Sequence, residues 1–142
     1  MRVPDSAYGK KRSACDFLLL HNGLMIGAEA KMITDGSKSF SFSKVSDSQI
    51  KGLKKIESEG GKGYILINFR WLGTGNDKGK AFALPYIDFL YLMWAFENDE
   101  ELSEEYTNDK SIPLDYFYKE VKEVPKLSLE KGYGWDLSVL YE

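Results

Sequence analysis

The first third of the chain alternates short apolar runs with polar turns. Apolar residues at 17–20 and 24–28 flank the dipeptide Asn22-Gly23. Asn-Gly between apolar runs is a strong hairpin signal, because both residues tolerate the positive φ that a type I′ turn needs. We therefore expect two antiparallel strands joined by this two-residue turn, with Asp16 opposite Glu29.

The pattern then changes from strand-like to helical. Residues 33–45 are rich in Ser, Lys and Gly and predict a loop. Ile50, Leu53 and Ile56 then recur at helical spacing within residues 46–59, and the following Gly60-Gly61 ends the expected helix. The apolar run 63–69 predicts a buried strand, which a polar turn connects to a short strand at 81–84.

Pro85 suits the first turn of a helix that runs to about Glu97. This segment is apolar almost all round, so we expect it to be buried or to face a partner subunit. Its large side chains are expected in the core first and in a dimer interface second; they are Tyr86, Phe89, Leu90 and Trp94. The tail at 112–142 is aromatic-rich with weak periodicity.

A length of 142 residues with 43% hydrophobic content fits a single domain. We divide it into a basic arm at 1–15, a core at 16–97, and an acidic loop with a C-terminal segment at 98–142. Residues 1–80 carry 14 Lys/Arg against 8 Asp/Glu, whereas residues 81–142 carry 5 against 14. The basic part could bind phosphate, although lysines that solvate exposed helices explain the excess equally well.

Several functional classes are disfavoured. The single Cys15 permits no internal disulfide and no cysteine-rich zinc module, and no apolar stretch is long enough to span a bilayer, so we expect an intracellular protein without a membrane role. Cys15 lacks a histidine at the same end of the hairpin, and His21 lies at the tip, so packing and turn roles are expected for them. The glycines at 73–79 lack the spacing of a nucleotide-binding loop.

The hairpin register brings three charged residues together. Cross-strand partners share a face and lie about 5 Å apart at Cβ, so Asp16 and Glu29 would be neighbours, and Lys31 would point to the same face. Facing carboxylates destabilise a sheet by up to about 1 kcal/mol, and a divalent cation would remove that conflict. The alternative is an ordinary hairpin in which Glu29 and Lys31 face solvent.

The order of short motifs is more specific than any one of them. It comprises RVPDS at 2–6, CDF at 15–17, GAEAK at 27–31, SQI at 48–50 and GGKGYILINFR at 60–70. In this order the chain resembles the PD-(D/E)xK nuclease superfamily, in particular RecU-type and phage Holliday-junction resolvases. The resemblance implies an α/β fold with a restriction-endonuclease-like mixed β-sheet flanked by helices.

The resemblance also implies site roles. Asp16 and Glu29 would ligate Mg²⁺, or Mn²⁺ in its place, and Lys31 would assist the nucleophile. Gln49 would help to position water or phosphate, but Ser46-x-x-Gln49 is equally a capping-box pattern. Such enzymes usually carry an N-terminal helix with another acidic residue ahead of the arm, whereas this sequence begins at the arm. Either two protein ligands suffice, or Asp5 substitutes, or a segment is lacking.

The expected activity is that of a homodimeric endonuclease that makes paired symmetric nicks in four-way DNA junctions, in the cytoplasm of a bacterial or phage-infected cell. A nuclease acting on flaps or duplex DNA, and a non-catalytic DNA-binding module of the same fold, are the alternatives. The candidate phosphate contacts are Lys10, Lys11, Arg12, Lys51, Lys54 and Lys55.

Overall fold

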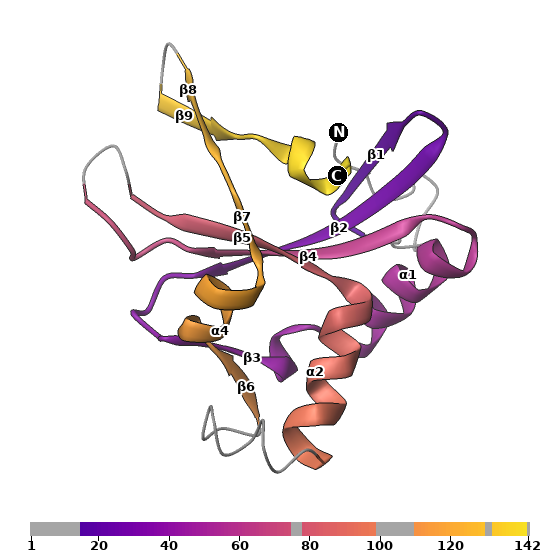
Figure 1. Ribbon diagram of the computed structural model, residues 1–142, viewed down its shortest axis with the longest axis horizontal. Coiled ribbons are helices and arrows are strands. Elements are labelled where there is room, and N and C mark those ends of the chain that lie inside the picture. Colours follow the sequence, from indigo (N-terminus) through magenta and orange to yellow (C-terminus); the bar gives the residue numbers. More distant parts are fainter. Residues whose placement is uncertain (1–14, 75–77, 99–109, 130–131, 142) are drawn as a thin grey trace, which may run out of the picture.

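The computed structural model describes residues 15–74, 78–98, 110–129 and 132–141. In these residues a five-stranded mixed sheet forms the centre of the molecule (Figure 1). In spatial order its strands are β1 (Phe17–His21), β2 (Leu24–Ile33), β4 (Lys62–Phe69), β5 (Lys80–Pro85) and β7 (Lys122–Val124). β2 and β4 run parallel, and the other neighbouring pairs are antiparallel.

Helices and short strands complete the fold. The described helices are α1 (Asp47–Ser58), α2 (Tyr86–Asn98) and α4 (Leu114–Glu120), with 3₁₀ turns at Phe42–Lys44 and Leu137–Tyr141. Two small antiparallel sheets pair β3 (Ser39–Ser41) with β6 (Ser111–Pro113) and β8 (Lys126–Leu129) with β9 (Gly132–Trp135). The mixed sheet with packed helices confirms the α/β, restriction-endonuclease-like fold class expected from the sequence.

Different elements pack against the two faces of the sheet. Side chains of α1, α2 and α4 pack with one face into a large core that includes Leu53, Phe89 and Phe117. On the other face a smaller cluster joins the sheet to the C-terminal segment through residues such as Leu140. Figure 1 shows the helices on one side and the β8–β9 hairpin with the C-terminal turn on the other. Successive residues of a strand therefore face different environments.

The hairpin forms as predicted. β1 and β2 pair from Phe17 opposite Ala28 to His21 opposite Leu24. Asn22 and Gly23 both have positive φ, at 50° and 80°, as a type I′ turn requires. The predicted register, which brings Asp16 opposite Glu29, is thus confirmed.

The prediction that residues 33–45 are only a loop is wrong. Ser39–Ser41 forms β3, which pairs with Ser111–Pro113, and Phe40 and Phe42 are both buried. The partner strand lies 70 residues further along the chain, so no local pattern reveals the pairing.

One core prediction for α2 is wrong. Tyr86 and Phe89 are buried as expected, but Trp94 is 58% exposed. Trp94 lies with Ile87 and Tyr91 on a helix face that no described element covers, because the core-facing side of α2 is already filled by residues such as Leu92 and Phe96. None of the helices in the described parts of the chain is long and apolar enough to cross a membrane.

Candidate active site

The candidate site lies where β2 extends beyond β1. Pairing with β1 ends at Ala28, whereas β4 accompanies β2 to Ile33. Among the described strands, none covers the other edge of residues 29–33. Glu29 and Lys31 lie on this open segment, and Asp16 precedes β1 directly opposite Glu29.

Asp16 is fixed to the open edge by a backbone contact. Its Oδ2 accepts a hydrogen bond of 3.0 Å from the amide of Ala30. This bond takes the place of the ladder partner that β1 no longer supplies. The Asp16 carboxylate is thereby held beside Glu29.

Glu29 is a buried carboxyl group with only 4% of its surface exposed. Burial, followed by the charge of Asp16 and a hydrogen bond with the Asp16 side chain, raises the Glu29 pKa from 4.5 to about 7, while Lys31 acts in the opposite direction. Its Oε2 is buried without a hydrogen-bond partner. An ionised Glu29 would therefore be an incompletely compensated buried charge.

Lys31 reaches α1 from the same face of β2. Its Nζ donates a hydrogen bond of 2.9 Å to Oε1 of Gln49. The same Oε1 accepts from the backbone amide of Ser46 at 2.9 Å, and the Ser46 hydroxyl accepts from the Gln49 amide, which completes a capping box. Gln49 is therefore both a helix cap and the contact of Lys31, so the two interpretations of this residue are compatible.

Gly27 permits α1 to approach β2 closely. A Cβ at this position would overlap Ile56 Cδ1 and would lie 3.0 Å from the Cys15 Sγ. Cys15 itself is buried and donates a hydrogen bond of 2.8 Å to the carbonyl of Phe17. Burial raises the pKa of the Cys15 thiol, which agrees with the packing role expected for it.

The donor set at the open edge fits a divalent cation. Asp16 and Glu29 supply oxygen ligands of the kind that Mg²⁺ prefers, and the unpaired Oε2 of Glu29 lacks only an electropositive partner. In the part of the chain that the structure describes, no group of three or more His, Cys, Asp or Glu residues is placed to hold a metal. The described ligand set is thus two carboxylates, and Asp5 lies outside the described residues.

The other predicted residues are distributed differently. Lys51, Lys54 and Lys55 are exposed on α1, the helix that also carries Gln49. Lys10, Lys11 and Arg12 lie outside the described residues. His21 occupies the hairpin tip as predicted, and its ring stacks on Tyr141 with centroids 4.1 Å apart.

One polar residue was not identified from the sequence. Asn68 interrupts the apolar pattern of β4, and its Oδ1 is buried without a hydrogen-bond partner. It lies on the face of the sheet opposite Ile65 and Ile67, which follows from strand alternation. The only sequence feature that could have identified Asn68 was a single amide side chain within the apolar run of β4.

Comparison with known proteins shows the family to which the chain belongs. The RecU family model, described as recombination protein U, matches residues 2–131. The Holliday junction resolvase RecU of Staphylococcus carnosus (strain TM300) is 25% identical over 136 residues, which are 92% of this chain and 62% of that relative. The chain therefore spans less than two thirds of the relative's length. Because the family match covers most of the sequence, this protein belongs to the RecU, or recombination protein U, family.

Proposed function

We propose that this chain is a metal-dependent endonuclease of the Holliday-junction resolvase type, with Asp16, Glu29 and Lys31 at its active site and residues 1–142 as one nuclease domain. The observation that carries the proposal is the buried, unpartnered Oε2 of Glu29 beside Asp16. A carboxyl pair held in this way destabilises the folded chain unless a cation or a proton joins it. A bound cation would compensate the charge of both carboxylates.

The protein residues would act in distinct ways. Asp16 and Glu29 would hold Mg²⁺ or Mn²⁺, which when bound supplies Lewis acidity toward a phosphate oxygen and a water molecule. Below a pH of about 7, Glu29 would release a proton as the cation enters. Lys31 would donate to the attacking water or to the charge that develops on the phosphate, and Gln49 would hold the Lys31 ammonium in place through the bond of 2.9 Å.

Four-way DNA is the proposed substrate because the S. carnosus relative is named a Holliday junction resolvase. Resolving a junction requires two cuts, so we propose a homodimer with one site in each subunit, acting in the cytoplasm. The exposed lysines of α1 would contact phosphates near the site, and the basic residues Lys10, Lys11 and Arg12 would contact phosphates elsewhere.

A cleavage assay tests the proposal. An end-labelled four-way junction is incubated with the protein and Mg²⁺, in parallel with Glu29→Gln and Lys31→Ala variants and an exposed-carboxylate control, Glu97→Gln. We expect symmetric nicks from the unaltered protein and the control, and a loss of at least about 100-fold in the two site variants. Equal cleavage by all four proteins would show that the active-site assignment is wrong.

Parallel reactions with flap and duplex substrates test the substrate class. Preferential cleavage of the four-way junction supports a resolvase. Equal cleavage of all three DNAs would instead indicate a nuclease of broader specificity, and tight junction binding without cleavage at any divalent cation concentration would indicate a DNA-binding module.

A further inference from the structure

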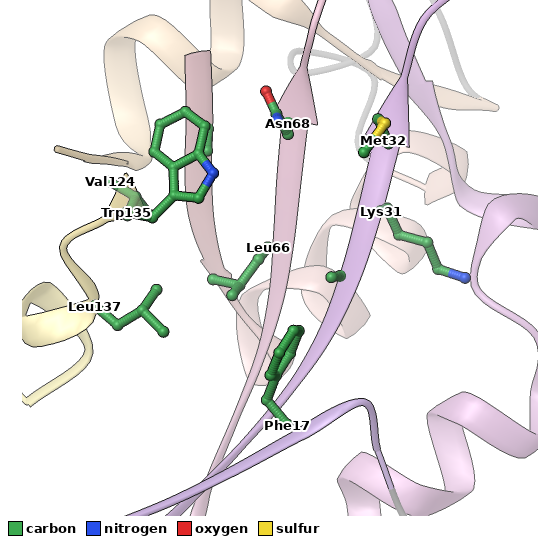
Figure 2. Close-up of a pocket in the computed structure, with 10 residues that line it drawn as sticks. Phe17, Lys31, Met32, Leu66, Asn68, Val124, Trp135 and Leu137 are labelled. Carbon is green, nitrogen blue, oxygen red and sulfur yellow. The ribbon is translucent and has the colours of Figure 1, made fainter. Parts of the chain in front are cut away.

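A cavity of about 410 Å³ lies against the central sheet near the candidate active site. Figure 2 shows the side chains that surround it, and the C-terminal segment closes one side. Its lining comes from β1, β2, β4 and the C-terminal segment and includes Phe17, Ala30, Lys31, Met32, Asn68 and Trp135.

The cavity and the candidate active site adjoin at β2, because Lys31 lines the cavity and its ammonium group reaches Gln49 on the α1 face. Ala30 lines the cavity and lies between Glu29 and Lys31, whose side chains are directed to the α1 face. In Figure 2 the ammonium end of Lys31 is directed away from the lining side chains of Asn68, Trp135 and Leu137. Because the edge of residues 29–33 is not covered by a described strand, a ligand could pass around a single backbone to reach both faces.

The lining of the cavity combines aromatic rings with one unpaired hydrogen-bond acceptor. Phe17 and Trp135 contribute aromatic rings to an otherwise mainly apolar wall. Asn68 contributes an amide whose Oδ1 is buried without a partner. An unpaired buried acceptor destabilises the protein, and a ligand carrying a hydrogen-bond donor would remove that penalty. The matching ligand is flat, apolar on its faces and equipped with a donor at its edge.

Positive charge borders the cavity. The Arg70 guanidinium approaches Sδ of Met32 to 3.9 Å, and the Lys126 ammonium lies 5.7 Å from the centroid of the Trp135 ring. Met32 and Trp135 both line the cavity. A ligand attached to a phosphate chain would therefore find cations next to its apolar binding surface.

We propose that this cavity binds an unpaired nucleobase of the DNA strand whose phosphate lies at Glu29 and Lys31, with the base against Trp135 and its amino group donating to Asn68. Adenine and cytosine carry such an amino group. A cavity of this volume is within the usual range of ligand sites. A base at a branch point loses less stacking and pairing energy on entering the cavity than a base within a duplex. The inference rests on the proposed nuclease function.

Binding of abasic junctions tests the proposal. Four-way junctions with one adenine or cytosine next to the branch point replaced by an abasic analogue, each position in turn, are compared with the intact junction. All proteins carry Glu29→Gln so that binding is measured without cleavage. At one position we expect the missing base to weaken binding by about 10-fold or more, the contribution of one stacked base.

Variants of the lining separate base binding from packing. Trp135→Leu and Asn68→Leu should bind intact and abasic junctions with nearly equal affinity, whereas Trp135→Phe should keep part of the difference. Trp94→Leu, an exposed tryptophan on α2, is the matched control and should keep all of it. If Trp135→Leu weakens binding to both DNAs by the same factor, Trp135 acts through packing and the proposal is wrong.

The outcomes also distinguish the two proposals. Junction cleavage by the unaltered protein, combined with no effect of an abasic substitution at any position, would overturn the base-binding site and leave the nuclease function standing. Absence of cleavage and of junction binding would overturn both. If the cavity instead holds an apolar peptide segment, the unaltered protein should cleave the junction and no abasic substitution should change binding.

Discussion

Gln49 Oε1 accepts one hydrogen bond from Lys31 Nζ and another from the Ser46 amide, each 2.9 Å long. A single oxygen atom therefore fixes both the first turn of α1 and the ammonium group of Lys31 on β2. The position of Lys31 depends on a residue 18 positions away that also caps a helix. A variant of Gln49 should consequently change both the stability of the protein and its cleavage rate, whereas a variant that removes only the helix cap should change the stability alone.

We expect Gln49→Ala to lower both stability and junction cleavage. Loss of the cap should reduce the free energy of unfolding by about 1 kcal/mol. Loss of the contact with Lys31 should reduce kcat by roughly 10-fold or more, because the ammonium is no longer held in one place. Denaturant unfolding and single-turnover cleavage measure the two effects.

Ser46→Ala is the matched comparison for Gln49→Ala. It removes the hydroxyl that accepts from the Gln49 amide but leaves the Ser46 amide as a donor to Oε1. The expected loss of stability is again about 1 kcal/mol, with kcat within a few-fold of the unaltered protein. Equal kcat values for the two variants would show that Gln49 does not position Lys31.

The raised pKa of Glu29 predicts a pH-dependent stability in EDTA. The Glu29 pKa is about 7 in the folded chain and 4.5 ordinarily, so between these pH values the folded state holds a proton that the unfolded state has released. The free energy of unfolding should therefore fall as pH rises from 4.5 to 7, by an amount of the order of 3 kcal/mol.

Glu29→Gln tests this dependence. The amide does not ionise, so the variant should lose the decline and should be more stable than the unaltered protein at pH 8. Thermal unfolding from pH 4.5 to pH 8.5 measures the difference, which should reach roughly 6–12 °C in Tm. Parallel pH profiles for the two proteins would mean that Glu29 ionises without penalty in the folded chain.

A divalent cation should reverse the effect of pH. At pH 8 Glu29 has lost the proton that it holds below its pKa of about 7, so a cation would compensate the two carboxylates instead. Saturation to 100 times Kd stabilises a protein by about 2.7 kcal/mol. We therefore expect Mg²⁺ or Mn²⁺ to raise Tm, and to do so more at pH 8 than at pH 5.5. Asp16→Asn and Glu29→Gln should each abolish the increase, and Glu97→Gln should retain it.

The hairpin and its carboxyl pair could be predicted from the sequence because local geometry determines them. Asn22-Gly23 specifies a turn, and the turn specifies which residues oppose each other. The hydrogen bond between Lys31 and Gln49 was not predictable in this way, since it depends on how α1 packs over β2. The same applies to β3, whose partner β6 is remote in sequence, and to Trp94, whose environment depends on which side of α2 meets the core.

The lysines of α1 predict a salt-dependent binding defect. Lys51 and Lys55 are exposed and lie one helical turn apart, so they point in the same direction. If both contact phosphates, Lys51→Ala with Lys55→Ala should reduce the slope of log K against log salt concentration by about 1.8, at 0.9 for each contact. Fluorescence anisotropy with a labelled junction measures the slope, and Lys38→Ala should leave it unchanged.

The contact between Gly27 and Ile56 predicts a specific rescue. A methyl group at position 27 would overlap Ile56 Cδ1, so Gly27→Ala should destabilise the protein by about 1–3 kcal/mol and displace α1 from β2. Ile56→Val removes Cδ1 and alone should cost about 0.5–1.5 kcal/mol. The double variant should be clearly more stable than the sum of the two single effects predicts.

Gly61→Ala is the control for this cycle. Its added Cβ would lie 2.6 Å from the carbonyl oxygen of Met25, a backbone atom that no side-chain truncation removes, as well as 2.8 Å from Cγ2 of Ile56. Ile56→Val keeps Cγ2 and should therefore give no rescue of Gly61→Ala. Urea unfolding of the six proteins, including the unaltered one, supplies both cycles. Strict additivity for Gly27→Ala with Ile56→Val would mean that α1 does not approach β2 as closely as the overlap at Gly27 requires.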